Sequence, residues 1–334
     1  MAREYRRSGF ISDTFSRPGF SLSSESDVSM ISESSTRPRC SHFFLMAPFV
    51  VVVALVVPVR AGAVESDSAC GTPLSSATVA EIVELSDISA ALDEESGSSS
   101  VRLEQAVERH RRITEILVAH RDRRGLLALG LDTVEQAAVM PLQRDPAAFD
   151  DPEWAHRISL DLLLRFLRNV HAEFTGAPTE PQWTHYFELT RRCELSPARV
   201  AMAGYNAHLT VDLANAVAAT RAVPANAPDY FEIVDAIASH GFLIVDVTKA
   251  VYGADLGPLW RFYFLGEGLD VVLGAGVATG PLLRLADAGA NVVIFGNGLA
   301  LQDPAAEPAV RAETDMLWRS ADTAFEVLAA HGAL

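Results

Sequence analysis

The sequence predicts an all-α protein, an irregular multi-helix bundle that forms a single domain after an amino-terminal leader. Beyond residue 100, apolar residues recur every three or four positions, which is the spacing of one face of a helix. No run alternates apolar and polar residues convincingly enough to predict a strand. Asp151–Pro152 and Ser196–Pro197 each place a capping side chain before a proline, a combination typical of the first helical turn. Together these features indicate a bundle of helices.

The amino-terminal segment has the composition of a leader. Residues 1–42 are rich in serine and arginine with little apolar periodicity, so we predict that they are disordered. Residues 43–63 combine the apolar run FFLMAPFVVVVALVVPV with an Ala-x-Ala end, which predicts a signal peptide that is cleaved after Ala63. The alternative is an uncleaved membrane anchor, although the run is short for a span and two prolines interrupt it. The leader is unusually long, and a translation start at Met30 would give it an ordinary length.

Export would decide where the protein resides and what its cysteines do. A cleaved signal peptide predicts a secreted or cell-envelope protein, whereas the uncleaved form would be anchored in the membrane through the leader alone. Cys70 and Cys193 remain after cleavage, and an oxidising compartment would permit one disulfide between them. The alternative is a pair of free thiols.

The charge balance argues against a nucleic-acid partner. The chain has a formal net charge of -16, and 49% of its residues are hydrophobic. Residues 1–63 carry seven Arg and five acidic residues, a net charge of +2, so the remainder carries -18. A surface that binds phosphates needs clustered lysine and arginine, which this balance does not provide.

The elements of the mature chain follow from capping, periodicity and breaking residues. Residues 64–100 are predicted to be a linker with one short helix, and residues 101–334 to be the helical-bundle domain. Within that domain we predict helices over residues 101–125, 126–140, 151–174, 181–193, 196–220, 230–252, 260–269 and 310–331.

Single residues refine this picture. Gly130 is expected to interrupt the second helix of the domain, and Pro141 to end it. His110 and His120 lie among the charged residues of the first helix, so we expect both at the surface. Three large aromatic residues are expected in the core rather than against a ligand: Trp183, Trp260 and Tyr263.

Residues 270–298, DVVLGAGVATGPLLRLADAGANVVIFGNG, have the outline of a dinucleotide-binding β-α-β unit. Gly274, Gly276 and Gly280 lie between apolar runs, as in a turn that cradles a pyrophosphate. However, no acidic residue closes the second run, and too few residues follow to complete a sheet. We therefore do not expect NAD or FAD as a cofactor. Glycine-rich helices in close contact, or an apolar hairpin, are simpler interpretations.

The predicted helix at 196–220, SPARVAMAGYNAHLTVDLANAVAAT, contains the candidate site. It is apolar enough to be buried, yet it includes Asn206, His208, Asp212 and Asn215. Buried polar side chains cost free energy unless partners satisfy them, so these four either form a network or line a site. At 3.6 residues per turn, His208 and Asp212 lie one turn apart on one face and can reach the same point.

The His208–Asp212 spacing suits three roles. The two side chains could share a divalent metal ion, with Asp161 of a preceding helix as a further ligand. Asp212 could instead orient His208 for proton transfer. Or the pair could be a hydrogen bond that joins helices, in which case His208→Ala would leave Asp212 without a partner. For Asp161 the alternative is an ion pair with Arg165, four residues further on.

The middle of the chain resembles a bacterial family of unknown function, DUF5995. The resemblance rests on DPEWAHRISLDLLLRFLRN, on the Pro-Gln-Trp of residues 181–183, and above all on AGYNAHLTVDLANAVAAT. That family has a similar N-A-H-(I/L)-x-x-D-L core, and the matching positions here are Asn206, Ala207, His208, Asp212 and Leu213. The resemblance implies the fold and the position of the site, and it implies no activity.

We therefore expect an exported helical-bundle protein that is either an enzyme or a binding protein. As a hydrolase-type enzyme, it would use His208 as metal ligand or general base, Asp212 as its partner, and Asn206 to position the substrate. The alternative is a non-catalytic protein that binds a small apolar or lipid-like molecule. A third hypothesis gives the polar residues a purely structural role.

Overall fold

The structure is a computed structural model that describes residues 69–89, 97–256, 279–332 and 334, with only the backbone for residues 279–288. These residues form helices and no strand, so the predicted all-α class is confirmed for this part of the chain. The predicted leader, its cleavage site and the helix expected at 260–269 lie outside the described residues. None of the helices in the described part has the length and hydrophobicity that a membrane span requires.

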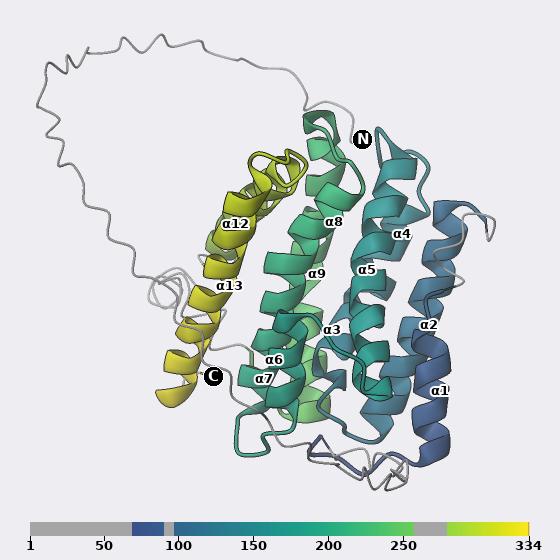
Figure 1. The fold of residues 1–334 in the computed structure, drawn as a ribbon, viewed down its shortest axis with the longest axis vertical. Coiled ribbons are helices and arrows are strands. Elements are labelled where there is room, and N and C mark those ends of the chain that lie inside the picture. Colours follow the sequence, from purple (N-terminus) through teal and green to yellow (C-terminus); the bar gives the residue numbers. More distant parts are fainter. Residues whose placement is uncertain (1–68, 90–96, 257–278, 333) are drawn as a thin grey trace, which may run out of the picture. The chain divides into compact units, whose positions relative to one another are not determined.

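The helices are joined mostly by short connections, and several of them lie side by side (Figure 1). In order they are α1 (Ser76–Ser86), α2 (Ser99–Ala119), α3 (Gly125–Val134), the π-helix η3 (Glu135–Val139), α4 (Met140–Gln143), α5 (Pro152–Thr175), α6 (Pro181–Thr190), α7 (Pro197–Asn206), the π-helix η4 (Ala207–Asp212), α8 (Leu213–Ala219), the 3₁₀-helix η5 (Pro224–Asn226), α9 (Ala227–Tyr252), α12 (Thr279–Ala300) and α13 (Glu307–Ala330).

The predicted helix starts are confirmed at both capping positions. The Asp151 carboxylate accepts a hydrogen bond of 3.0 Å from the backbone N–H of Trp154, and α5 begins at the proline between them. The Ser196 hydroxyl accepts one of 3.0 Å from the N–H of Arg199 at the start of α7. Each cap satisfies one of the backbone N–H groups that the first helical turn leaves without a partner.

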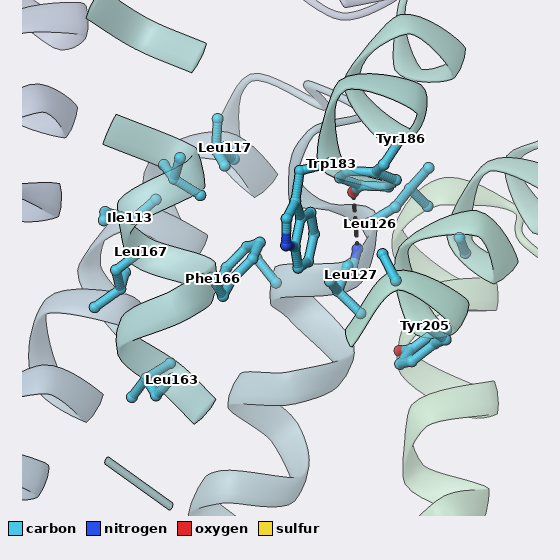
Figure 2. Packing of buried hydrophobic residues seen from close by; sticks show 14 of the residues in the cluster. Ile113, Leu117, Leu126, Leu127, Leu163, Phe166, Leu167, Trp183, Tyr186 and Tyr205 are labelled. Atoms are coloured by element: carbon cyan, nitrogen blue, oxygen red, sulfur yellow. Dashed lines mark hydrogen bonds between the residues drawn. The ribbon is translucent and has the colours of Figure 1, made fainter. Parts of the chain in front are cut away.

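The main core lies between α2, α3, α5, α6 and α7 (Figure 2). Trp183 and Phe166 are fully buried and pack ring against ring, with centroids 5.2 Å apart. The Tyr186 hydroxyl accepts a hydrogen bond of 3.3 Å from the backbone N–H of Leu127, so that its polar end is satisfied inside the core. The prediction that Trp183 packs in the core is confirmed, while Trp260 and Tyr263 lie outside the described residues.

The last two helices, α12 and α13, pack against the segment α7–η4–α8, which corresponds to the predicted helix at 196–220. α12 contacts α8 and α9, and α13 contacts α7 and η4 (Figure 1). The contact between α12 and α8 is so close that a Cβ atom at Gly298 would lie 2.4 Å from the Cβ of Val217. Residues 279–300 form one continuous helix, so the second strand of a β-α-β unit is not present there. Gly298 therefore lies at a close contact between two helices, which agrees with one of the simpler interpretations of this segment.

Two of the expected helix breaks are wrong. α3 continues through Gly130, because this glycine lets Tyr205 of α7 approach: a Cβ atom there would lie only 1.7 Å from the Tyr205 hydroxyl. Pro141 does not end the helical segment but stands in the first turn of α4, directly after the π-helix η3. A proline is tolerated in a first turn because its missing N–H is not needed there.

Cys70 and Cys193 form a disulfide, with their Cα atoms 5.4 Å apart. The bond joins the segment before α1 to the connection between α6 and α7, across a sequence separation of 123 residues. Of the two alternatives that the sequence left open, the structure has the bonded pair.

Candidate functional site

The predicted helix at 196–220 is helical almost throughout, but a π-helix interrupts its centre. Residues Ala207–Asp212 form η4, between α7 and α8. A π-helix bonds each N–H to the carbonyl five residues earlier, and single π turns are frequent at functional sites. His208 and Asp212 both lie in this turn, and they are 5% and 0% exposed. The prediction that these polar residues are buried is therefore confirmed.

Asp212 is bound to α6. Its two carboxylate oxygens accept hydrogen bonds from the Gln182 side-chain amide at 3.1 Å and the Trp183 indole N–H at 2.9 Å. Burial raises the pKa of the Asp212 carboxyl to about 7, and the charge of Glu180 acts in the same direction, while the two hydrogen bonds oppose it. This carboxyl group therefore connects the π turn to the core.

His208, unlike Asp212, lines a cavity. Its Nδ1 atom is buried and has no hydrogen-bond partner in the described part of the protein. Burial lowers the pKa of His208 to about 3, and the charge of His110 adds to this. The imidazole is consequently neutral at physiological pH.

His208 and Asp212 have separate hydrogen-bonding surroundings. No hydrogen bond joins them among the described residues, and each has a different set of neighbours. The expected contact assumed an uninterrupted α-helix, and the π turn alters the geometry on which that expectation depended. The structural hypothesis that paired them needs the same correction, because the partners of Asp212 are Gln182 and Trp183.

Asn206 and Asp161 have contacts of their own. The Asn206 amide donates a hydrogen bond of 2.8 Å to the backbone carbonyl of Trp318, which fastens α7 to α13. Asp161 forms an ion pair of 2.6 Å with Arg165, the alternative given above. Among the described residues, Asp161, His208 and Asp212 do not form a group that could hold a metal ion.

The cavity at His208 has a volume of about 570 Å³. Its walls come mainly from α3, α5, η4 and α9, and most of the side chains that line it are aliphatic, including Leu131, Ile158, Met202, Leu213, Ile237 and Val245. The Tyr205 hydroxyl, like His208 Nδ1, is a buried polar atom at a lining residue without a partner in the described part of the chain. Burial raises the pKa of this phenol far above its usual value of 10.0.

A second polar cluster was not predicted. His110 is completely buried, and its Nδ1 atom lies 2.7 Å from a carboxylate oxygen of Glu135, with Asp132 beside them. Burial alone would lower the pKa of His110, but the charge and hydrogen bond of Glu135, together with Asp132, raise it above 6.5. Burial also raises the pKa of Asp132, an effect that the charge of His110 partly opposes.

The surface position expected for His110 is therefore wrong. The charged composition of the helix suggested exposure, but the position of His110 within the helical repeat decides its burial. It follows Leu103 and Val107 and precedes Thr114 and Leu117, all of them buried on one face of α2. That spacing was the signal by which the sequence could have placed this histidine inside.

The fold and the cavity define a helical-bundle protein with a largely apolar cavity that is partly open to solvent. Residues 103–254 match the model of DUF5995, a family of unknown function. The resemblance stated from the sequence is thereby confirmed. No curated protein and no solved structure matches the chain. The matched segment includes His208, both π-helices and most of the residues that line the cavity.

Proposed function

We propose that this protein binds an apolar or lipid-like small molecule in the cavity around His208. The observation that carries the proposal is the cavity itself, with its volume of about 570 Å³ and its mostly apolar walls. Ligand sites typically occupy roughly 300–1,000 Å³ and combine apolar walls with a few polar groups. A non-catalytic protein that binds such a molecule is the alternative to a hydrolase that the sequence suggests.

The polar atoms of the wall indicate what the ligand carries. His208 Nδ1 and the Tyr205 hydroxyl are both buried without partners, and each such group costs about 1–3 kcal/mol if nothing satisfies it. A neutral imidazole offers one donor and one acceptor, and a neutral phenol offers the same pair. A hydroxyl or carbonyl group on an otherwise apolar molecule would suit them better than an ionised carboxylate.

A hydrolase-type reaction at His208 is the second candidate. Its support is that an imidazole nitrogen without a partner faces a cavity able to hold a substrate. A reaction has less support than binding, because Asn206 and Asp212, which were expected to act with His208, are hydrogen-bonded to other residues. Hydrolysis of p-nitrophenyl esters by the purified protein, lost in His208→Ala, would favour the enzyme over the binding protein.

We also propose that the protein is exported and that its leader is cleaved after Ala63. The Cys70–Cys193 disulfide supports export, because disulfides persist in oxidising compartments and are rare in the cytosol. Mass spectrometry of the amino terminus of the protein, expressed from the full chain in a secreting host, tests this. A mature terminus at Val64 is expected, and an intact leader would favour the membrane anchor.

Binding is tested with a matched pair of glycine variants. Gly241 lines the cavity and Gly296 does not, yet a Cβ atom at either position would meet nothing within 4 Å. Both glycines lie inside helices, so Gly241→Phe and Gly296→Phe change helix propensity alike. The phenylalanine at 241 would fill part of the cavity, whereas at 296 it would not.

The assay uses N-phenyl-1-naphthylamine, a neutral apolar dye that fluoresces when it leaves water. We expect saturable binding to the wild type, at least tenfold weaker binding to Gly241→Phe, and unchanged binding to Gly296→Phe. Dodecanol should displace the dye better than dodecanoate, and His208→Leu should reduce that difference. Equal binding by both glycine variants, with no apolar molecule extracted from the wild type and identified by mass spectrometry, would contradict the proposal.

A further inference from the structure

We propose that His110, Asp132 and Glu135 bind a divalent transition-metal ion beside the cavity. The three residues come from neighbouring helices: His110 from α2, Asp132 from α3 and Glu135 from the first position of η3. Each offers one ligand atom, and these atoms all lie within 4.8 Å of one another. This set is separate from Asp161, His208 and Asp212, which the sequence suggested as ligands.

The geometry is close to that of a metal site. Ligands bonded to one ion at about 2.0–2.2 Å can be no more than about 4.4 Å apart, so small side-chain movements would suffice. His110 Nδ1 and the nearest Glu135 oxygen are already 2.7 Å apart. Because an imidazole and two carboxylates leave coordination positions open, the ion would retain water or take a further ligand.

The surroundings leave room for a positive charge. His110 is fully buried and the Glu135 side chain is 12% exposed. Arg111 is a basic residue whose charge acts on Asp132, but it forms ion pairs with Glu108 and Glu115 on the surface of α2. A metal ion binds a deprotonated ring nitrogen, so its binding would release the proton that His110 shares with Glu135 and leave two carboxylates, whose charge a divalent cation would balance.

The position of the cluster connects it to the cavity. Leu131 and Val134 line the cavity, and they stand next to Asp132 and Glu135 in the sequence. Glu135 opens one π-helix, and His208 lies in the other. A bound ion would therefore fix the α3–η3 part of the cavity wall, through residues that do not themselves line the cavity.

The ion is tested by stoichiometry on the intact protein. Protein expressed from the full chain is stripped with a chelator and titrated with Zn²⁺ and with Mn²⁺, and bound metal is measured by elemental mass spectrometry after gel filtration. We expect about one ion per chain for at least one of the two metals. Failure of the wild type to retain either ion overturns the proposal without any variant.

Matched variants locate the ion. Asp132→Asn and Glu135→Gln keep the shape of each side chain, and each should weaken binding at least tenfold. The control is Asp322→Asn, which removes a carboxylate that also pairs with a histidine, His185, at 2.8 Å but belongs to no group of three ligands among the described residues. Metal binding that is unchanged in both cluster variants would place the ion elsewhere and contradict the assignment.

Folding of the variants is controlled separately. Circular dichroism reports whether each variant retains its helices, and melting with and without metal reports binding independently of the gel-filtration step. A Co²⁺ absorption spectrum of the wild type adds a direct signature of nitrogen and oxygen ligands. If one cluster variant fails to fold, the other and this spectrum still decide the question.

Discussion

Replacement of His208 should change how stability depends on pH. Burial lowers the pKa of this histidine to about 3, whereas the unfolded chain takes up the same proton near the ordinary value of 6.5. Between these values the unfolded state binds one more proton than the folded state, so acidification favours unfolding. The contribution of His208 is therefore fully present above pH 6.5 and is lost as the pH falls toward 3.

The size of this effect follows from linkage. Each pH unit within the window costs about 1.36 kcal/mol, so the loss at His208 between pH 6.5 and pH 4 is about 3 kcal/mol. It is a large fraction of the roughly 5–15 kcal/mol by which a folded protein is stable. His208→Gln removes the titrating group, and its free energy of unfolding should lack this part of the acid dependence.

The assay is urea denaturation of wild type and variant at half-unit intervals from pH 4 to pH 8. The difference between the two free energies of unfolding should change by about 3 kcal/mol below pH 6.5 and stay constant above pH 7. His208→Leu separates charge from packing, because it should shift the whole curve but have the same slope as His208→Gln. Curves of both variants that run parallel to that of the wild type would refute the reasoning.

Three further predictions concern contacts around the site. Asp212→Asn should change the pH dependence in the opposite direction, because burial raises the pKa of Asp212 to about 7. In urea titrations the free energy of unfolding of the wild type should fall by up to about 4 kcal/mol as the pH rises from 4 to 7, and that of the variant should lack this fall. Gly298→Ala should destabilise by about 1–3 kcal/mol in the same assay, because its Cβ would lie 2.4 Å from a side chain of α8, whereas Gly296→Ala should stabilise by up to about 1 kcal/mol. Reduction of the Cys70–Cys193 bond should lower the free energy of unfolding by about 2–5 kcal/mol, and a Cys70→Ser variant should then be insensitive to reductant.

The helices were largely predictable because their signals are local. The Asp151 and Ser196 caps act over three residues, and the apolar repeat of each helix acts over a few turns. The errors arose where a distant neighbour decides the local structure. Gly130 looked like a break, but it is the place where Tyr205, 75 positions further along the chain, comes into contact with α3.

The candidate site was predictable only in part. The burial of His208 and Asp212 follows from the apolar helix around them, and the structure confirms it. Their partners do not follow, because Gln182 and Trp183 reach Asp212 from a different helix. The π turn in which both residues lie has no local sequence signal comparable to a capping residue or a proline. The charged neighbours of His110 favour a surface position, whereas its place in the apolar repeat of α2 buries it.

The contacts of the two site residues give their variants different meanings. Asp212 is satisfied by Gln182 and Trp183, so its removal would disturb the packing of α6 on η4 and would report on folding. His208 has a ring nitrogen without a partner at the cavity, so its removal leaves those hydrogen bonds intact. A loss of ligand binding in a His208→Leu variant that keeps its helices and unfolds cooperatively would therefore be attributable to the cavity. The same loss in Asp212→Asn would not, because the fold around η4 changes with it.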